Sequence, residues 1–234
     1  MKKVFAFIAM AIASMGIANA QIGVVGGVTF TGTDVNTKDL WANAQNITQY
    51  HVGVAYRVDL GILAFQPTLT YEVKGASLDQ TVANIQVGGQ NLQQATQDFE
   101  TKTGFIELGL GVQAGVDLMM FKPFVEVSPF IGYGITGQEN YNITAAGIAN
   151  GTTTNEDVNA ALTDVKNKLE VGFGLGAGVL VMDHIQLKVQ YFMNLGKLYD
   201  EGKIDANDKL TTIKESYKDI KNYNGIKISL GLFF

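Results

Sequence analysis

Eight segments of this 234-residue chain alternate between apolar residues and polar or small ones, and this alternation constrains the fold more than any other feature. A period of two is the pattern of a β-strand whose two faces meet different surroundings. Each segment is about ten residues long, which is the length that a tilted strand needs to cross a bilayer. The segments cover residues 23–30, 51–58, 65–73, 106–116, 125–135, 171–181, 185–194 and 226–234.

The connections between these segments alternate in length. Three are short, at 59–62, 117–122 and around Asp183. The four others are long, and they comprise residues 32–49, 75–100, 137–168 and 196–224. Outer-membrane barrels have short turns on the periplasmic side and long loops outside the cell. The order therefore predicts an all-β fold: an eight-stranded antiparallel up-and-down transmembrane β-barrel with long extracellular loops.

The two faces of the strands differ in composition. One face is almost entirely apolar, whereas the other mixes glycine, of which the chain has 27, with charged residues of both signs. Buried charges are costly unless they are paired, and small residues suit a narrow interior. We expect the mixed face to line the lumen as an ion-pair network and the apolar face to meet lipid. The expected network residues are Arg57, Glu72, Glu107, Glu126, Lys188 and Lys227. The alternative is a soluble barrel of the lipocalin kind, which would turn the apolar face inward.

Aromatic residues fall near the ends of the predicted strands. Phe30, Tyr71, Tyr133 and Tyr191 lie on the apolar face near the outer ends, and Phe65 and Phe234 lie at the opposite rim. Aromatic girdles on either side of an apolar band are typical of membrane barrels. We therefore expect the first four residues to form the outer girdle.

The first twenty residues have the three parts of a secretory signal. Lys2 and Lys3 precede an apolar run over 4–18, and Ala18-Asn19-Ala20 matches a signal-peptidase site. A membrane anchor is the alternative, but a run of about 15 residues is short for a spanning helix. We expect a signal peptide over 1–20, cleaved after Ala20, and a single barrel domain over 21–234. Loss of the signal peptide takes the formal net charge from −5 to −7, so we expect no nucleic-acid partner.

Several short motifs support a family resemblance. They are Gly26 to Phe30, Phe65 to Tyr71, Lys122 to Gly134, Gly174 to Val179, and the closing Ile228 to Phe234. In their order, the chain from residue 21 onward resembles the small outer-membrane β-barrel family that includes PorT-like proteins. The resemblance implies an aromatic C-terminus that the barrel-assembly machinery reads, a role we assign to Phe234 with Leu232 and Leu230. It implies no shared chemistry.

Few residues could support catalysis or bind a metal. The chain has no cysteine, which excludes disulfides and thiolate sites, and its only histidines are His51 and His184. We expect His51 at the outer end of its strand and His184 at a periplasmic turn, so they cannot share a metal. A lipid hydrolase would need His51 beside a serine such as Ser77. The G-x-G-x-x-A matches at 109–114 and 172–177 lie in alternating strands, so we interpret them as glycine rows rather than nucleotide loops.

Two of the long loops have helical periodicity. Val158, Ala161, Leu162, Val165 and Leu169 are spaced as on one helix face, and Leu210, Ile213, Tyr217 and Ile220 on another. We expect short helices there, which either cover the mouth of the barrel or bind a partner. Trp41 in the first loop is likewise either a packed anchor or a contact residue.

These observations lead to one main hypothesis and two alternatives. We expect a non-enzymatic outer-membrane barrel without cofactor or metal, whose loops act in surface interaction or envelope organisation. Its partners would be outer-membrane lipid, the barrel-assembly machinery and an unknown extracellular partner. The first alternative is a small channel or a transport or secretion accessory. The second is a lipid-modifying outer-membrane enzyme.

Overall fold

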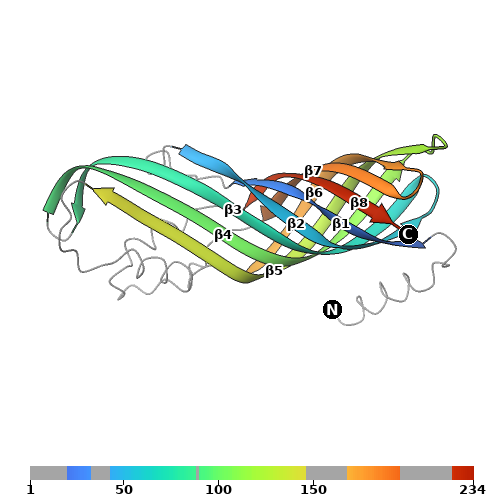
Figure 1. The fold of residues 1–234 in the computed structure, drawn as a ribbon, viewed down its shortest axis with the longest axis horizontal. Helices are drawn as coiled ribbons and strands as arrows, with labels where there is room; N and C mark the ends of the chain where they lie inside the picture. Colours follow the sequence, from blue (N-terminus) through green and yellow to red (C-terminus); the bar gives the residue numbers. More distant parts are fainter. Residues whose placement is uncertain (1–19, 33–42, 88–89, 146–167, 196–222) are drawn as a thin grey trace.

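A computed structural model describes residues 20–32, 43–87, 90–145, 168–195 and 223–234 (Figure 1). The described residues form eight strands, and they contain no helix long and apolar enough to cross a membrane. The strands are β1 (Ala20–Gly32), β2 (Asn43–Asp59), β3 (Leu63–Val87), β4 (Gln90–Gly115), β5 (Phe121–Ala145), β6 (Leu169–Val181), β7 (Ile185–Leu195) and β8 (Asn224–Phe233).

The strands close into one barrel in the order of the sequence. Each strand pairs antiparallel with the next, and β8 returns to β1 from Gly23↔Phe233 to Gly32↔Asn224. Consecutive pairing with closure is the up-and-down topology, which leaves no free edge within the barrel wall. The predicted eight-stranded antiparallel barrel is therefore confirmed.

The two ends of the barrel differ in their connections. At one end, short turns join β2 to β3, β4 to β5 and β6 to β7, and the chain ends there at Phe234 (Figure 1). We call this the turn end. At the other, which we call the loop end, the connections at 33–42, 88–89, 146–167 and 196–222 lie outside the described residues. The predicted helices at 158–169 and 210–220 also fall there, apart from Leu169, which is the first residue of β6 and not part of a helix.

The main difference from the sequence-based expectation is the length of β2, β3, β4 and β5. Residues 43–49, which were expected in the first loop, belong to β2. Residues 75–100 were expected to be a loop, but 75–87 belong to β3 and 90–100 to β4, and the pairing of these strands continues to Val87↔Gln90. Likewise β5 continues to Ala145, although β6 accompanies it only as far as Tyr133↔Leu169. The prediction was wrong because this stretch is rich in Gln, Thr and Asn and lacks apolar alternation. Cross-strand pairing, which the periodicity of a single segment does not reveal, holds these residues in the sheet.

Figure 1 shows the consequence for the shape. The sheet of β3, β4 and β5 extends well past the barrel on the loop-end side, whereas β1, β6, β7 and β8 stop near the rim. The start of β2 adds four further register pairs, from Asn43↔Asp79 to Asn46↔Ala76, at the base of this extension. We call the residues of β3, β4 and β5 beyond Gly75, Lys102 and Gly137 the blade.

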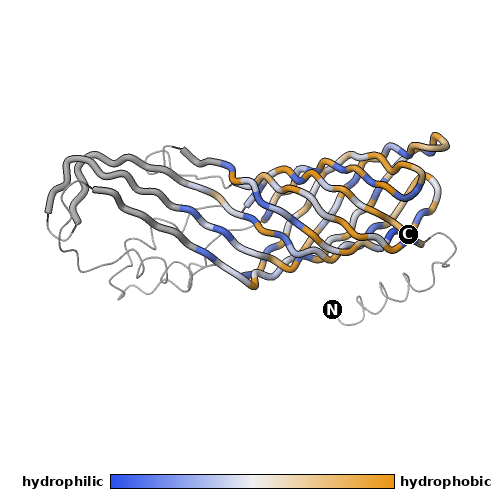
Figure 2. The backbone as a smooth tube through the Cα atoms, viewed as in Figure 1, coloured by the Kyte–Doolittle hydropathy of each residue, from blue (hydrophilic) through white to orange (hydrophobic). Residues whose placement is uncertain are grey.

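Inside the barrel wall the two faces of each strand are separated by polarity. On β5, Val127 points outward and is 51% exposed, whereas its neighbour Glu126 points inward and is 2% exposed. The same alternation runs around the wall, so that orange and pale or blue positions alternate along the barrel strands in Figure 2. The apolar side chains therefore cover the outside, and the charged side chains are buried in the lumen.

Glycine allows neighbouring strands to approach closely at the seam between β1 and β8. A Cβ atom added at Gly27 would collide with the carbonyl oxygen of Ile228, and one added at Gly225 would collide with that of Phe30. Any larger residue at these two positions would push the seam apart. The glycines of the mixed face thus serve the closure of a narrow barrel.

Candidate functional site

The lumen contains most of the buried charge of the described residues. Because side chains alternate along each strand, the inward positions of β3, β4, β6 and β8 point toward one another. Near the loop end they bring together Glu72 and Lys74 from β3, Glu107 from β4, Glu170 from β6 and Lys227 from β8. We call these five residues the loop-end cluster.

The two lysines link the three carboxylates of the loop-end cluster. Lys74 Nζ lies 2.7 Å from Glu107 Oε2 and 2.9 Å from Glu170 Oε1. Lys227 Nζ lies 2.5 Å from Glu72 Oε2 and 3.0 Å from Glu107 Oε1. Glu107 therefore bridges both cations, and each charge is compensated by at least one neighbour. This is the arrangement that makes buried charge tolerable.

Aromatic rings complete the closure at this level. Lys74 Nζ lies 4.6 Å from the ring centroid of Phe130, 4.8 Å from that of Phe192 and 5.4 Å from that of Phe105. Tyr223 packs edge-on against Phe105 at 6.3 Å between centroids. Such rings attract a cation through their negative faces and also exclude water. The loop-end side of the lumen is therefore filled by paired charges and aromatic side chains.

A second group of polar residues lies toward the turn end. Glu126 accepts hydrogen bonds from Lys188 Nζ at 2.8 Å, Gln113 Nε2 at 2.6 Å and Gln190 Nε2 at 3.1 Å. Gln113 also accepts a hydrogen bond from Arg57. We call these five residues the turn-end cluster.

At the mouth of the barrel, Asp59 joins Arg57 of the turn-end cluster to one further cation, Lys122. Asp59 Oδ2 lies 3.2 Å from Arg57 Nη2 and 2.5 Å from Lys122 Nζ. Gln66 and Gln186 exchange hydrogen bonds of 3.1 and 2.9 Å across the lumen. The turn-end side is therefore also occupied by connected side chains rather than by an open passage.

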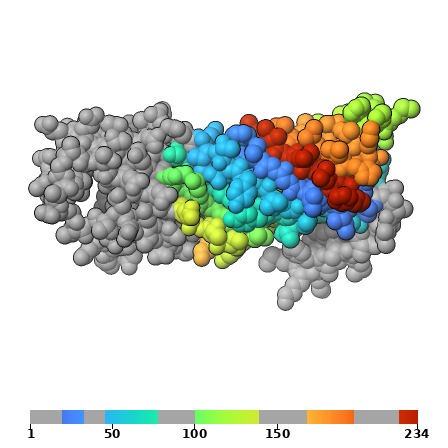
Figure 3. All heavy atoms as spheres, viewed as in Figure 1, coloured from blue at the N-terminus to red at the C-terminus, as the bar shows by residue number. Residues whose placement is uncertain are grey.

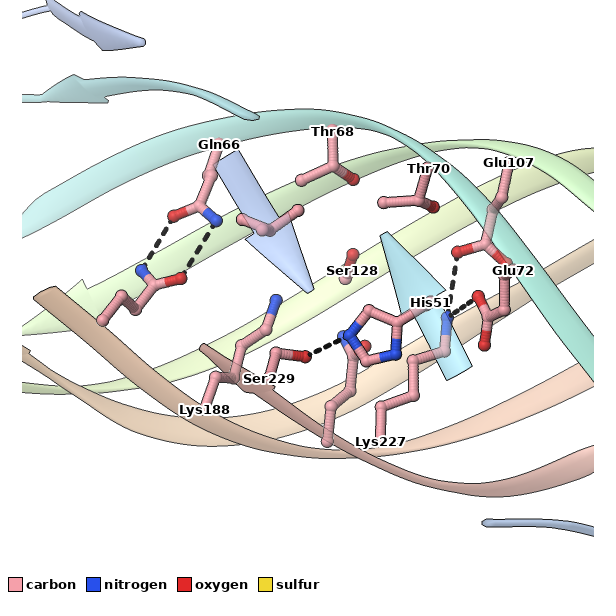
Figure 4. A pocket seen from close by; sticks show the side chains of 13 residues that line it. His51, Gln66, Thr68, Thr70, Glu72, Glu107, Ser128, Lys188, Lys227 and Ser229 are labelled. Atoms are coloured by element: carbon pink, nitrogen blue, oxygen red, sulfur yellow. Dashed lines mark hydrogen bonds and ion pairs between the residues drawn. The ribbon is translucent and has the colours of Figure 1, made fainter. Parts of the chain in front are cut away.

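His51 lies between the two clusters. Its Nδ1 is 2.9 Å from Thr29 Oγ1 and its Nε2 is 2.9 Å from Ser229 Oγ, so both ring nitrogens have hydroxyl partners. The cavity that it lines has a volume of about 40 Å³, which suits a few water molecules. Figure 4 shows this chamber, with Lys227, Glu72 and Glu107 on one side and Lys188 and Gln66 on the other.

The position of His51 corrects one expectation. It was expected at the outer end of its strand, but β2 continues outward to Asn43, and His51 sits inside the barrel opposite Gly27 and Glu72. The proposed pairing of His51 with Ser77 is also wrong. Ser77 lies five residues along β3 from Glu72, which is about 17 Å of strand, so it cannot reach His51. His184 is exposed at the turn end, as expected.

The structure brings all six residues of the expected network into the lumen. Glu72, Glu107 and Lys227 meet in the loop-end cluster, and Arg57, Glu126 and Lys188 meet in the turn-end cluster. Sequence reasoning missed Lys74 and Glu170, which complete the loop-end cluster. Both could have been found by extending the alternation, since Lys74 shares the parity of Glu72, and Glu170 that of Gly172.

The residues assigned to the girdle and to assembly lie on the outer face. Tyr133 and Tyr191 are exposed, and Phe30 and Tyr71 are half-buried; Tyr50, which sequence reasoning missed, lies 6.2 Å from Tyr71 between ring centroids. Leu230, Leu232 and Phe234 are exposed on the outer face of the closing strand. Their roles in membrane anchoring and in assembly stay predictions.

The chemistry available at this site is limited. Within the described part of the chain, no three His, Asp or Glu residues are arranged to hold a metal ion. Ser229 and His51 form a contact between a hydroxyl and a base, but Thr29 rather than a carboxylate orients the imidazole. Thr29 itself is 3.5 Å from Glu72. The arrangement is suited to filling and stiffening a narrow barrel.

Three comparisons place the chain among known proteins. The family described as outer membrane protein beta-barrel domain matches residues 13–200. No curated protein matches. Among solved structures, Neisserial surface protein A is similar, with 11% identity, 92% of this chain and 97% of that chain covered, and a TM-score of 0.42. Ail, the attachment invasion locus protein of Yersinia pestis, has 9% identity, coverage of 92% and 99%, and a TM-score of 0.39.

Proposed function

Because this chain belongs to the outer membrane protein beta-barrel domain family, we propose that it is a non-enzymatic barrel of the outer membrane whose blade contacts a macromolecule outside the cell. The family and the apolar outer face both indicate that the barrel lies in the outer membrane. Short turns of outer-membrane barrels lie on the periplasmic side, so in this proposal the turn end faces the periplasm and the loop end faces the exterior.

The observation that carries the proposal is the length of the blade. Twelve register pairs join β3 to β4 from Gly75↔Lys102 outward to Val87↔Gln90, and β5 accompanies them as far as Ala145. At about 3.4 Å per residue, this places roughly 40 Å of paired strand beyond the rim. A barrel that only had to span the membrane would not need such an extension, whereas a protein that contacts an external partner gains reach from it.

The filled lumen supports the same proposal. The blade is continuous with β3, β4 and β5 of the wall, and the loop-end cluster ties β3 and β4 to β6 and β8 across the lumen. These ion pairs hold the base of the blade to the opposite wall. A rigid base lowers the entropy cost of binding, because less freedom is lost when a partner is contacted.

The two alternative functions gain less from the structure. A small channel would need a passage, but the lumen between the clusters has room for only a few waters. A lipid-modifying enzyme would need its serine and histidine within reach of an acyl chain. Ser229 and His51 instead face this small cavity, with the apolar outer face on the other side of the wall.

Photo-cross-linking on intact cells tests the proposal. A photo-reactive residue would replace Gln138, which is exposed on β5 beyond the rim, and in a matched control it would replace Val127, which is exposed in the apolar band of the same strand. We expect a macromolecular adduct from position 138 and none from position 127.

A shortened variant completes this test. Ser77 and Glu100 are register partners, so an Asn-Gly turn can replace residues 78–99 and close the hairpin there. We expect the shortened barrel to insert and the adduct from position 138 to be lost. Absence of any adduct from the full-length protein, or an adduct that survives shortening, would contradict the proposed role of the blade.

A further inference from the structure

The turn end presents an exposed apolar group to its surroundings. The β4–β5 turn contains Leu118, Met119, Met120 and Phe121, and the β6–β7 turn contains Met182. Met119 is 95% exposed and Met182 is 58% exposed. The amide of Met182 donates to the carbonyl of Met120 at 2.8 Å, which joins the two turns. We call these five residues the apolar tip.

The backbone of the apolar tip is strained, and packing of its side chains against the rest of the protein does not offset the energetic cost of this strain. Met119 has φ 66° and Met182 has φ 50°, in the left-handed region where glycine, asparagine or aspartate is less costly. The β2–β3 turn uses glycine for this purpose, with Gly61 at φ 87°. Methionine side chains that are mostly exposed regain little of this cost by packing within the protein. Contact with something outside the chain would explain their presence.

Four backbone amides of the tip, those of Leu118, Met119, Met120 and Met182, have acceptors within the protein. Asp117 Oδ1 accepts a hydrogen bond from the amide of Met119 at 2.9 Å, and Leu118 and Met120 donate at 2.9 Å to the carbonyls of Phe121 and Leu118. Lipid tolerates only backbone whose donors and acceptors are internally paired. The hydrogen bonds of the tip therefore allow its entry into the membrane.

The charges near the tip point away from its apolar side. Lys122 is buried and bonded to Asp59, and Asp59, Asp117 and Asp183 line a cavity at the mouth of the barrel together with Lys122. Residues 118–121 themselves carry no charge. An electrically neutral, apolar surface is what the acyl region of a bilayer accepts.

The tip continues the lipid-facing surface of the wall. On β5 the outward residues are apolar from Phe121 through Val127 to the girdle residue Tyr133. At about 3.4 Å per residue and a tilt of roughly 40°, this run spans about 31 Å along the membrane normal, against about 25 Å for the usual apolar band. The tip would thus reach the boundary between acyl chains and headgroups. In Figure 3 the hairpin of β4 and β5, in yellow-green, projects at the turn end beside β6.

We propose that the apolar tip, residues 118–121 with Met182, is embedded in the periplasmic leaflet at the boundary between acyl chains and headgroups. It anchors the β4–β5 and β6–β7 turns there. The inference rests on membrane insertion of the barrel and not on the proposed role of the blade, so either can fail without the other.

Tryptophan fluorescence tests the location of the tip. Trp41 is the one tryptophan of the chain, so Trp41→Phe provides a silent background. In that background Leu118→Trp and Met182→Trp report on the two turns separately, and either one suffices if the other fails to fold. Val127→Trp on the same barrel is the lipid reference, and Gln138→Trp on the blade is the water reference. Each refolded protein is placed in phosphatidylcholine vesicles with or without bromine on the acyl chains, and folding is checked by circular dichroism.

We expect both tip reporters to emit at shorter wavelength than Gln138→Trp and to be quenched by brominated lipid to an extent approaching that of Val127→Trp. Aqueous iodide should quench them several-fold less than it quenches Gln138→Trp. Emission and iodide quenching equal to those of Gln138→Trp would place the tip in water and overturn the proposal. Shielding from both quenchers, with cross-linking between copies, would show a protein contact and would overturn it as well.

Discussion

Lys74 is the residue on which the loop-end cluster depends most. It is fully buried, it contacts Glu107 and Glu170 directly, and three aromatic rings surround its ammonium group. Two carboxylates would lose a neighbouring cation if it were removed. Breaking a buried ion pair from one side costs more than the intact pair contributes, because the remaining charge stays desolvated.

Replacing Lys74 by Met should therefore lower the free energy of unfolding by about 3–5 kcal/mol, as measured by urea unfolding in lipid vesicles. Lys102 provides a matched control, since it pairs with Glu100 at 2.6 Å but lies on the blade with its side chain 32% exposed. Lys102→Met should cost less than about 1 kcal/mol. Equal effects of the two substitutions would mean that the lumen around Lys74 is open to water.

Substitution of His51 can distinguish a structural role of this residue from a catalytic one. Its two hydroxyl partners, Thr29 and Ser229, suggest that it holds β1, β2 and β8 together. His51→Ala should lower the midpoint of thermal unfolding, and Ser229→Ala should lower it less because only one of the two hydrogen bonds is lost. The lipid A and phospholipid profiles of overexpressing cells should be the same for wild type and both variants. A lipid change that disappears with His51→Ala would support the enzyme alternative instead.

At the scale of the element, the blade is the feature that distinguishes this barrel. The sequence of its strands lacks the apolar alternation that lets a sheet pack against a core. Their paired conformation therefore depends on the hydrogen-bond ladder between β3, β4 and β5. An isolated two-stranded ribbon is marginally stable in water, whereas a third strand and a fixed base add stability. The register of the ladder is therefore the property to measure.

Engineered disulfides can measure that register, and the absence of native cysteine makes the result unambiguous. Thr81 and Thr96 are register partners on β3 and β4. The pair Thr81→Cys with Thr96→Cys should form a cross-link under mild oxidation, detected by mobility in gel electrophoresis. Thr81→Cys with Asn91→Cys, which is five residues out of register, should not. The opposite result would show that residues 78–99 form a loop of different geometry.

At the scale of the whole molecule, the barrel combines a filled lumen with an asymmetric outline. The two clusters and the aromatic residues close the interior, and the paired strands of the blade extend past the rim on one side of the barrel (Figure 1). About eight strands leave an interior that side chains just fill.

This closure predicts the behaviour of the protein in planar bilayers. The purified full-length protein should show no steady conductance at moderate voltage, because an ion would have to displace the paired charges of both clusters. A general porin in the same chamber serves as the positive control. Reproducible unitary openings from the protein alone would favour the channel alternative and would mean that the clusters separate.

The sequence by itself determined the class of the fold, the number of barrel strands and the polarity of each face. These follow from local patterns, since the alternation of Ile226 to Phe234 or of Val125 to Tyr133 records which environment each side of a strand meets. The residues between neighbouring segments also predicted the short connections. The same alternation, extended by a few positions, contained Lys74 and Glu170, although the boundaries drawn from apolar residues left them out.

Only the tertiary structure decided which charges meet and how far the strands continue. Lys74 and Glu170 are 96 residues apart in the chain, and their contact depends on the stagger between strands that do not neighbour one another in the sheet. The blade lacks apolar alternation in its sequence, so its strands could be recognised only from their pairing with each other. Patterns of one segment report the environment of that segment, whereas pairing between segments is a property of the closed barrel.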